Sequence, residues 1–190
     1  MRFYKIGMML LLCSISFAGE IINIQTSGNL ESKYTLGCAD VAKIRNIHTP
    51  ADLYKSLASC IKEENYERAI YYYAVAGAYG YFDAYRVSDK SARQAITVLK
   101  MLNFQDIEEA KKVKFLEEFK KHRTSPKMKE TCKSLFKLGK PDYYPRYMIE
   151  HGIQAFTNSK TDGLLENYNA DTIWDDALFK YVKCEKNAID

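Results

Sequence analysis

Residues 49–86 read TPADLYKSLASCIKEENYERAIYYYAVAGAYGYFDAYR, and this stretch predicts two helices folded back on each other. Thr49 can cap the first helix, and Pro50 suits the first helical position, where no amide hydrogen is needed. Leu53, Leu57 and Ile61 then recur at helical spacing on one apolar stripe. The polar residues 63–65 interrupt this pattern and predict the turn between the two helices.

A second helix is predicted from Tyr66 to about Tyr79, because small and aromatic residues share one of its faces. That face carries Ala69, Tyr72, Tyr73, Ala76 and Gly80. Small residues let two helices approach closely, and tyrosine rings can fill the space on either side. We expect Gly77, Gly80 and residues 81–83 to end this helix, and the rest of the chain to pack around the hairpin.

Residues 65–70 read NYERAI, and Tyr72, Tyr73 and Ala76 follow. This pattern resembles the second half of a tetratricopeptide or Sel1-like repeat, a family in which a tyrosine and two alanines hold the two helices of the repeat together. Where the repeat has a leucine-glycine pair, this chain has Ser56 and Leu57, and no second copy follows at the repeat period. The resemblance covers residues 50–80 and implies a helical hairpin without the groove of a repeat array.

The amino terminus predicts a secretory signal peptide over residues 1–18. Arg2 and Lys5 precede an apolar run over residues 8–13, and Ser16 and Ala18 place small residues at the −3 and −1 positions of a cut after Ala18. The apolar run is too short to span a bilayer. A lipid anchor at Cys13 is the alternative, but it normally requires a small residue where Leu12 stands. We therefore expect a periplasmic or secreted protein.

Cleavage would leave four cysteines, and an even number in an exported chain predicts disulfide bonds. Four cysteines allow three pairings. We favour Cys38–Cys60 and Cys132–Cys184, because each of these bonds ties an arm or a terminal helix to the body. The separations between the cysteines do not provide the closely spaced ligand pairs of a zinc site.

The rest of the chain predicts further helices and no convincing strand after residue 26. Their expected ranges are 92–102, 106–122, 125–139, 145–156 and 171–184. Asp106 and Asp171 are the expected caps of the fourth and last helices, and Gly139 is expected to end the fifth. The prediction is an all-α, single-domain bundle of about six to seven helices: an N-terminal arm with a short helix over 19–48 and a helical domain over 49–190.

Composition and charge exclude several classes of function. Without Arg2 and Lys5, 26 basic and 24 acidic side chains remain, which gives no concentrated charge for binding nucleic acid. Lysines cluster between residues 111 and 133, but glutamates alternate with them, as on a solvated helix face. The histidines at 48, 122 and 151 are isolated from one another and from the cysteines at ligand spacing. We therefore assign no metal, cofactor or catalytic residue.

Two groups of polar residues remain as candidate sites. At the junction between the second and third helices, the first contains Asp83, Arg86, Asp89, Arg93 and Gln94. The second contains Arg146, Glu150 and His151. As functional sites, they would offer an arginine for an anionic substrate and a Glu150–His151 acid–base couple. As structural groups, which we favour, they would form ion pairs that fix the junctions between helices.

Seven tyrosines lie between residues 66 and 85, which is more than one helix face can bury. Tyr71 and Tyr79 fall away from the alanine face, and Tyr81 follows near the end of the predicted helix. These tyrosines either pack beneath a second layer of helices, which we favour, or form an exposed strip. Exposed tyrosines are typical of recognition surfaces.

The sequence favours a non-catalytic exported module of the bacterial envelope that binds a protein or peptide. One specific form is an inhibitor or immunity protein against a secreted toxin, an interpretation that rests on analogy of format alone. The alternatives are a cell-envelope hydrolase that uses Glu150, His151 and nearby acids, and a glycan-binding module that uses exposed tyrosines.

Overall fold

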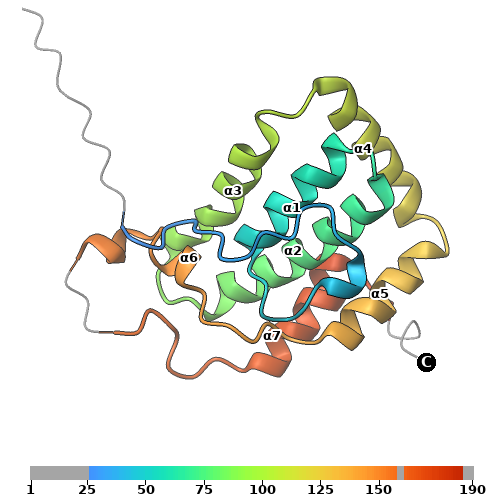
Figure 1. Ribbon diagram of the computed structural model, residues 1–190. Coiled ribbons are helices and arrows are strands. Elements are labelled where there is room, and N and C mark those ends of the chain that lie inside the picture. The colour runs from blue at the N-terminus through green and yellow to red at the C-terminus, as the bar shows by residue number, and fades with distance from the viewer. Residues whose placement is uncertain (1–25, 158–160, 186–190) are drawn as a thin grey trace, which may run out of the picture.

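The computed structural model describes residues 26–157 and 161–185, and these residues form an all-α fold (Figure 1). They contain seven α-helices with several short 3-10 turns between or beside them, and no strand beyond one isolated bridge between Val87 and Leu164. No helix in this part of the chain is long and apolar enough to cross a membrane. The predicted signal peptide lies outside the described residues.

The two predicted central helices are α1 (Pro50–Lys62) and α2 (Tyr66–Arg86), which run antiparallel at the centre of the molecule. Thr49 caps α1 as expected: its side chain accepts a hydrogen bond from the Asp52 amide, and the Asp52 carboxylate accepts one from the Thr49 amide at 2.8 Å. Helix α2 contacts α1, α4, α5 and α7, so it forms the centre of the core.

The prediction that α2 ends near Tyr79 is wrong, because the helix continues to Arg86. Gly77 and Gly80 instead provide room for neighbouring side chains. A Cβ atom at Gly77 would lie 2.8 Å from Cε1 of Tyr181, and one at Gly80 would lie 2.7 Å from Cδ1 of Ile96. Two glycines within a helix cost helical stability, and here close packing explains their presence.

The other helices surround this pair (Figure 1). They are α3 (Ala95–Phe104), α4 (Glu109–Arg123), α5 (Lys127–Leu138), α6 (Arg146–Ile149) and α7 (Ala170–Asp176), and α7 continues into a π-helical turn, η4 (Ala177–Val182). Three short 3-10 helices complete the list: η1 (Val41–Lys43), η2 (Lys90–Gln94) and η3 (Ile153–Phe156). Gly139, at a φ of 79°, ends α5 as predicted.

Several expected helix boundaries differ from the structure. The helix expected over 92–102 is observed as α3, Ala95–Phe104, because residues 90–94 form the 3-10 helix η2. Helix α4 begins at Glu109 rather than after Asp106, because Ile107 turns into the core. Asn169, not Asp171, caps α7. The helix expected over 145–156 ends after Ile149, because the Asp89 carboxylate accepts a hydrogen bond from the Gln154 amide at 2.8 Å and stabilises a separate 3-10 turn.

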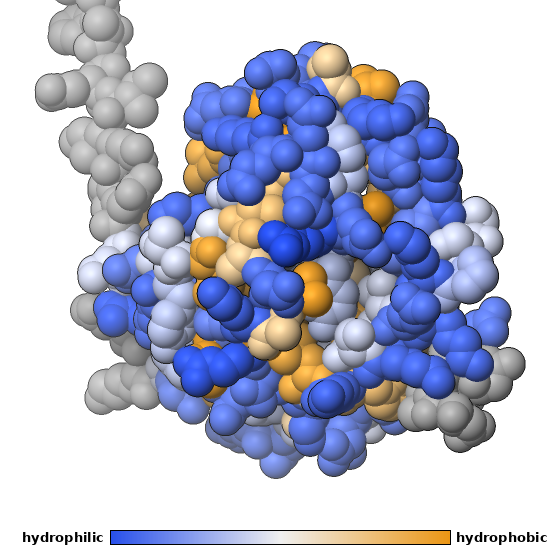
Figure 2. All heavy atoms as spheres, turned by 45° about the vertical axis from the view of Figure 1, so that its right-hand side comes forward, coloured by the Kyte–Doolittle hydropathy of each residue, from blue (hydrophilic) through white to orange (hydrophobic). Residues whose placement is uncertain are grey.

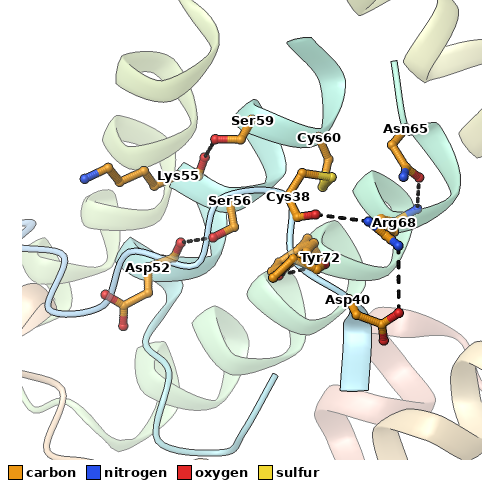
Figure 3. The surroundings of a disulfide bond; sticks show 11 residues. Cys38, Asp40, Asp52, Lys55, Ser56, Ser59, Cys60, Asn65, Arg68 and Tyr72 are labelled. Carbon is orange, nitrogen blue, oxygen red and sulfur yellow. Dashed lines mark hydrogen bonds and ion pairs between the residues drawn. A yellow bond between two sulfur atoms is a disulfide. The ribbon is translucent and has the colours of Figure 1, made fainter. Parts of the chain in front are cut away.

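Both predicted disulfide bonds are present, Cys38–Cys60 and Cys132–Cys184. The first attaches the N-terminal arm to α1. Figure 3 shows Arg68 of α2 beside it, where the guanidinium donates to the Cys38 carbonyl oxygen at 3.2 Å and faces Asp40 at 3.8 Å. Buried Asp52 accepts hydrogen bonds from two further arm amides, those of Lys33 and Tyr34. The arm is therefore a fixed layer over the hairpin.

The surface is mainly hydrophilic, as the charge of the sequence implies. On the face shown in Figure 2, hydrophobic residues gather in an interrupted strip that hydrophilic residues border on both sides. Lysines of α4 form ion pairs with the interspersed glutamates, for example Lys121 with Glu118 at 2.9 Å. This is the solvated helix face that the alternating charges predicted.

Candidate functional site

One face of α2 combines buried residues with side chains that reach a partly exposed surface. Ile70, Ala74, Gly77, Tyr81 and Tyr85 lie on it, spaced four, three, four and four residues apart. This spacing keeps side chains on one side of an α-helix, and at 1.5 Å per residue the face is about 22 Å long. The π-helical turn η4 packs against its middle, where Gly77 lets Tyr181 approach the helix.

Three tyrosine rings contact one another along this face, Tyr81 stacked on Tyr85 and tilted against Tyr181, and we call these three residues the aromatic strip. The ring centroids of Tyr81 and Tyr85 are 4.5 Å apart, and those of Tyr81 and Tyr181 are 5.5 Å apart. Tyr85 is 46% exposed and Tyr181 is 41% exposed. Desolvation and the neighbouring Tyr85 raise the pKa of Tyr81 to about 12, so the Tyr81 phenol is neutral at physiological pH.

Arg93 extends the aromatic strip at its Tyr85 end. Its guanidinium carbon lies 5.3 Å from the centre of the Tyr85 ring, which is the geometry of a cation–π contact. The Nε atom of Arg93 is buried and has no hydrogen-bond acceptor among the described residues. The structure thus brings together two of the predicted site residues, Tyr81 and Arg93, through Tyr85.

At its other end the aromatic strip leads into a pocket of about 320 Å³, which we call the apolar pocket. It lies between α2, α4, α5 and η4, and Tyr181 belongs to both features. Its lining consists of Ile70, Tyr73, Ala74, Phe119, His122, Arg123, Met128, Thr131, Tyr181, Val182 and Lys183. The Cys132–Cys184 disulfide holds the end of η4 to α5 beside this pocket. A mainly apolar pocket of this size is suited to a small ligand or to one anchoring side chain.

His122 lies on the polar side of the apolar pocket. Its Nε2 atom is 2.9 Å from the Thr131 hydroxyl, and the His122 side chain is half-buried. Burial lowers the pKa of His122, and the nearby Lys127 lowers it further, while Glu67 acts in the opposite direction. The imidazole is therefore mostly neutral at pH 7 and can exchange hydrogen bonds rather than bind an anion by charge.

The other half of the first predicted polar group, Asp83 and Arg86, is buried in the core on the opposite side of α2. The Asp83 carboxylate accepts hydrogen bonds from Arg86 Nε at 2.9 Å, Tyr143 at 2.9 Å and Tyr147 at 2.8 Å. Arg86 also donates to the Tyr143 carbonyl oxygen. Burial raises the pKa of Asp83, whereas Arg86 and the two phenols oppose that shift. All these groups satisfy one another, so this is a structural cluster with no access for a ligand.

Arg146, Glu150 and His151 hold the N-terminal arm in place. Arg146 donates to the Ser27 carbonyl oxygen at 3.0 Å and faces Glu150 at 3.7 Å. His151 Nδ1 lies 2.9 Å from Asn29 Oδ1, and burial lowers the pKa of His151. These contacts match the structural interpretation of the group. None of them reaches Arg86 or Arg93, which a composite catalytic site would require.

The remaining predicted tyrosines occupy different environments. Tyr79 is fully buried: its ring packs near Tyr143 and Trp174, and its hydroxyl donates to the Gly139 carbonyl oxygen at 3.0 Å. Tyr79 therefore cannot contact a partner, and the prediction that it belongs to an exposed tyrosine strip is wrong. Tyr71 is half-buried beside a polar cleft of about 430 Å³, and burial raises the pKa of Tyr71 to about 12.

The sequence analysis missed Tyr85, Tyr181 and the residues of the apolar pocket. The four-residue spacing of Tyr81 and Tyr85 was a usable signal, which the early end predicted for α2 concealed. Nothing in the sequence linked Tyr181 to these residues, because it is about a hundred positions away and reaches α2 only through the tertiary fold.

No protein-family model, curated protein or solved structure matches the chain. The resemblance of residues 50–80 to a tetratricopeptide or Sel1-like hairpin stays a prediction. No group of three or more histidine, cysteine or acidic side chains lies close enough to hold a metal ion within residues 26–157 and 161–185. The candidate site must therefore be judged from its own geometry.

Proposed function

We propose that the protein is an exported, non-catalytic module that binds a protein or peptide on the aromatic strip and in the apolar pocket. One observation carries this proposal: tyrosine rings from α2 and η4 pack against one another, remain partly exposed, and border a pocket large enough for one side chain. Aromatic residues beside an apolar pocket are typical of the residues that dominate binding energy in protein interfaces.

Two further features support the proposal. The two disulfides indicate a chain that folds in an oxidising compartment, which agrees with the predicted signal peptide. The contacts of Tyr81 and Arg93 with Tyr85 already cover part of the Tyr85 ring, the surface on which a sugar would stack. A peptide that uses the pocket and the ring edges therefore suits the surface better than a glycan does.

The proposed role includes inhibition of, or immunity to, a secreted toxin as one specific form. Such a role needs a rigid surface, and the disulfides and the fixed arm supply one. The hydrolase alternative lacks comparable support, since the Glu150 carboxylate faces Arg146 at 3.7 Å and His151 contacts Asn29 of the N-terminal arm.

Site-specific photo-crosslinking tests the proposal directly. A benzophenone amino acid replaces Tyr85 in one variant and Tyr144 in a control, because these tyrosines are similarly exposed, at 46% and 49%. In the cells that produce the protein, we expect a discrete adduct from position 85 and none from position 144. A pull-down of the mature protein should then recover the same partner at near-equal stoichiometry.

Two results would contradict the proposal. The first is equal crosslinking from positions 85 and 144, which would mean that no defined surface is used. The second is turnover of peptidoglycan fragments by the purified protein that survives Tyr85→Ser and disappears in Glu150→Gln. That pattern would favour the hydrolase instead.

A further inference from the structure

The basic side chains around α4 and α5 fall into two groups that differ in their partners. Along α4, lysines pair with glutamates: Lys112 with Glu109 at 3.3 Å, Lys114 with Glu118 at 3.2 Å, and Lys121 with Glu118 at 2.9 Å. At the start of α5, Lys127 pairs with Glu67 of α2 at 2.9 Å. The charge of these four lysines is therefore largely balanced within the chain.

The apolar pocket has a different electrostatic environment. Its lining includes the cations Arg123 and Lys183, together with His122, and it includes no aspartate or glutamate. Arg123 and Lys183 are both exposed, and neither forms an ion pair with a carboxylate in the described part of the chain. The guanidinium of Arg123 rests 6.0 Å from the centre of the Phe119 ring, which also lines the pocket.

The positive charge continues beyond the pocket. Arg123 and Lys183 also border an adjoining cleft of about 410 Å³, to which Lys129 adds a third cation and Glu185 a single carboxylate. An apolar cavity surrounded by excess positive charge favours a partner that combines an apolar side chain with negative charges. We call Arg123, Lys129 and Lys183 the basic rim.

We propose that the occupant of the apolar pocket is an acidic peptide segment of a protein partner, with one large apolar side chain in the pocket and aspartate or glutamate on the basic rim. This inference rests on the proposed function and adds the chemistry of the partner to it. Arg123 is suited to the contact because its planar guanidinium can hold a carboxylate through two parallel hydrogen bonds. The aromatic strip would then contact the part of the segment on the other side of the anchor.

A peptide is favoured over a nucleic acid by the surroundings of the basic rim. Phosphate backbones require an extended positive track, but Lys112, Lys114 and Lys121 of α4 are paired with Glu109 and Glu118. The apolar pocket also provides a place for a side chain, and the aromatic strip continues from Tyr181, at the edge of the pocket, to Tyr81 and Tyr85 on the last two turns of α2.

Selection from a displayed library of random octapeptides tests the inference without assuming a sequence. The mature, disulfide-bonded protein is the target, alongside an Arg123→Gln/Lys183→Gln variant. A Lys120→Gln/Lys133→Gln variant serves as the matched control. It loses the same net charge from exposed lysines of α4 and α5 that do not line the pocket.

We expect the selected peptides to place aspartate or glutamate next to an aromatic or large aliphatic residue. A resynthesised acidic peptide should bind the Arg123→Gln/Lys183→Gln variant about three- to tenfold more weakly, and its binding should weaken with added salt. Its amide analogue, with Asn and Gln in place of the acids, should not distinguish this variant from the wild type. The lysine control should retain wild-type affinity.

The outcomes separate the two proposals. Apolar peptides without acidic bias, or the same acidic bias in the Arg123→Gln/Lys183→Gln variant, would overturn the inference about charge and leave the binding function intact. Failure to enrich any peptide on the wild type would overturn both proposals. Stronger retention of single-stranded oligonucleotide than of any selected peptide would replace the peptide with a nucleic acid.

Discussion

The last two turns of α2 carry two groups of polar and aromatic residues that differ in almost every physical respect. Asp83 and Arg86 face the core, where every donor and acceptor in their cluster with Tyr143 and Tyr147 has a partner. Tyr81 and Tyr85 face the surface, stacked on each other and bordering Arg93, whose Nε lacks an acceptor. The comparison shows that adjacent residues of one helix can serve stability on one face and recognition on the other.

The largest expected effect on stability comes from disrupting the buried cluster of Asp83, Arg86, Tyr143 and Tyr147. Asp83→Ala would leave the Arg86 charge without a partner and remove the acceptor of two buried phenols, so we expect a loss of about 3–5 kcal/mol in the free energy of unfolding. Urea denaturation of the disulfide-bonded protein measures this change. The double variant Asp83→Leu/Arg86→Met should recover part of the loss, because it removes the uncompensated charge. Equal loss in both variants would contradict the role assigned to the ion pair.

The two disulfides provide the next test, since each holds a different part of the molecule. Removing Cys132–Cys184 by a double Cys→Ser change should cost about 2–4 kcal/mol and should also weaken binding, because the bond holds the end of η4 beside the apolar pocket. The control is the corresponding removal of Cys38–Cys60, which should cost similar stability yet leave the affinity of the folded fraction unchanged. Denaturation and titration of a selected peptide measure the two effects.

The glycines of α2 test the contact between the helix and Tyr181. Gly77→Ala places a methyl group against the rigid Tyr181 ring, so we expect a net destabilisation of about 1–2 kcal/mol and a displaced aromatic strip. In Gly80→Ala, the new methyl group contacts the flexible end of the Ile96 side chain. The gain in helix propensity, about 0.5–1 kcal/mol, should offset the cost of moving that side chain. Thermal unfolding compares the two variants. Equal shifts in Tm would argue against the close contact between Gly77 and Tyr181.

Acid should destabilise the molecule through its histidines. Burial is the main cause that lowers the pKa of His48, His122 and His151, so between pH 7 and 5 the unfolded chain binds more protons than the folded chain. The contribution of these neutral histidines to the free energy of unfolding is fully present above the unfolded-state pKa of about 6.5, and it is lost as the pH falls below that value. His48 accepts a hydrogen bond from the Arg45 amide through Nδ1, which protonation would break. His48→Asn keeps an acceptor, and it should flatten the pH dependence in urea titrations.

The smallest effect on stability is expected on the exposed side. Tyr85→Ser removes a ring that is nearly half exposed, so the free energy of unfolding should change by about 0.5 kcal/mol or less. Affinity for a selected peptide should nevertheless fall more than tenfold, as expected for an aromatic residue that dominates an interface. Tyr144→Ser is the matched control and should leave affinity unchanged. A large loss of stability with unchanged affinity would reverse the comparison between the two faces of α2.

Several features of the fold could be predicted because their causes are local. The Thr49–Pro50 helix start, the end of α5 at Gly139 and the all-α class follow from capping chemistry and periodicity within a few residues. Both disulfide pairs were also predicted, since only two bonds were needed to tie the arm and the last helix to the body. The helix boundaries predicted at Asp106 and at residue 156 failed where a tertiary contact outweighed the local signal. The cap predicted at Asp171 failed because Asn169, two residues earlier, accepts a hydrogen bond from the Thr172 amide instead.

The candidate site was predicted only in part. The sequence patterns placed Arg93 in one group with Asp83 and Arg86, and Tyr81 in another group with Tyr71 and Tyr79. They offered no signal that Tyr81 and Arg93 would form one pair and Asp83 and Arg86 a different one. The difference between these pairs is burial, which depends on whether Tyr143 and Tyr147 or solvent lie opposite each residue.

The sequence by itself determined the helical hairpin and the crosslinks, because caps, apolar spacing and cysteine number act over short distances or by simple counting. The tertiary structure alone decided which face of α2 became a surface. Tyr181 reaches Tyr81 from the far end of the chain, and Gly77 permits that approach only once η4 has packed against α2. Whether a tyrosine is core or recognition surface depends on what packs against it, and that partner comes from elsewhere in the chain.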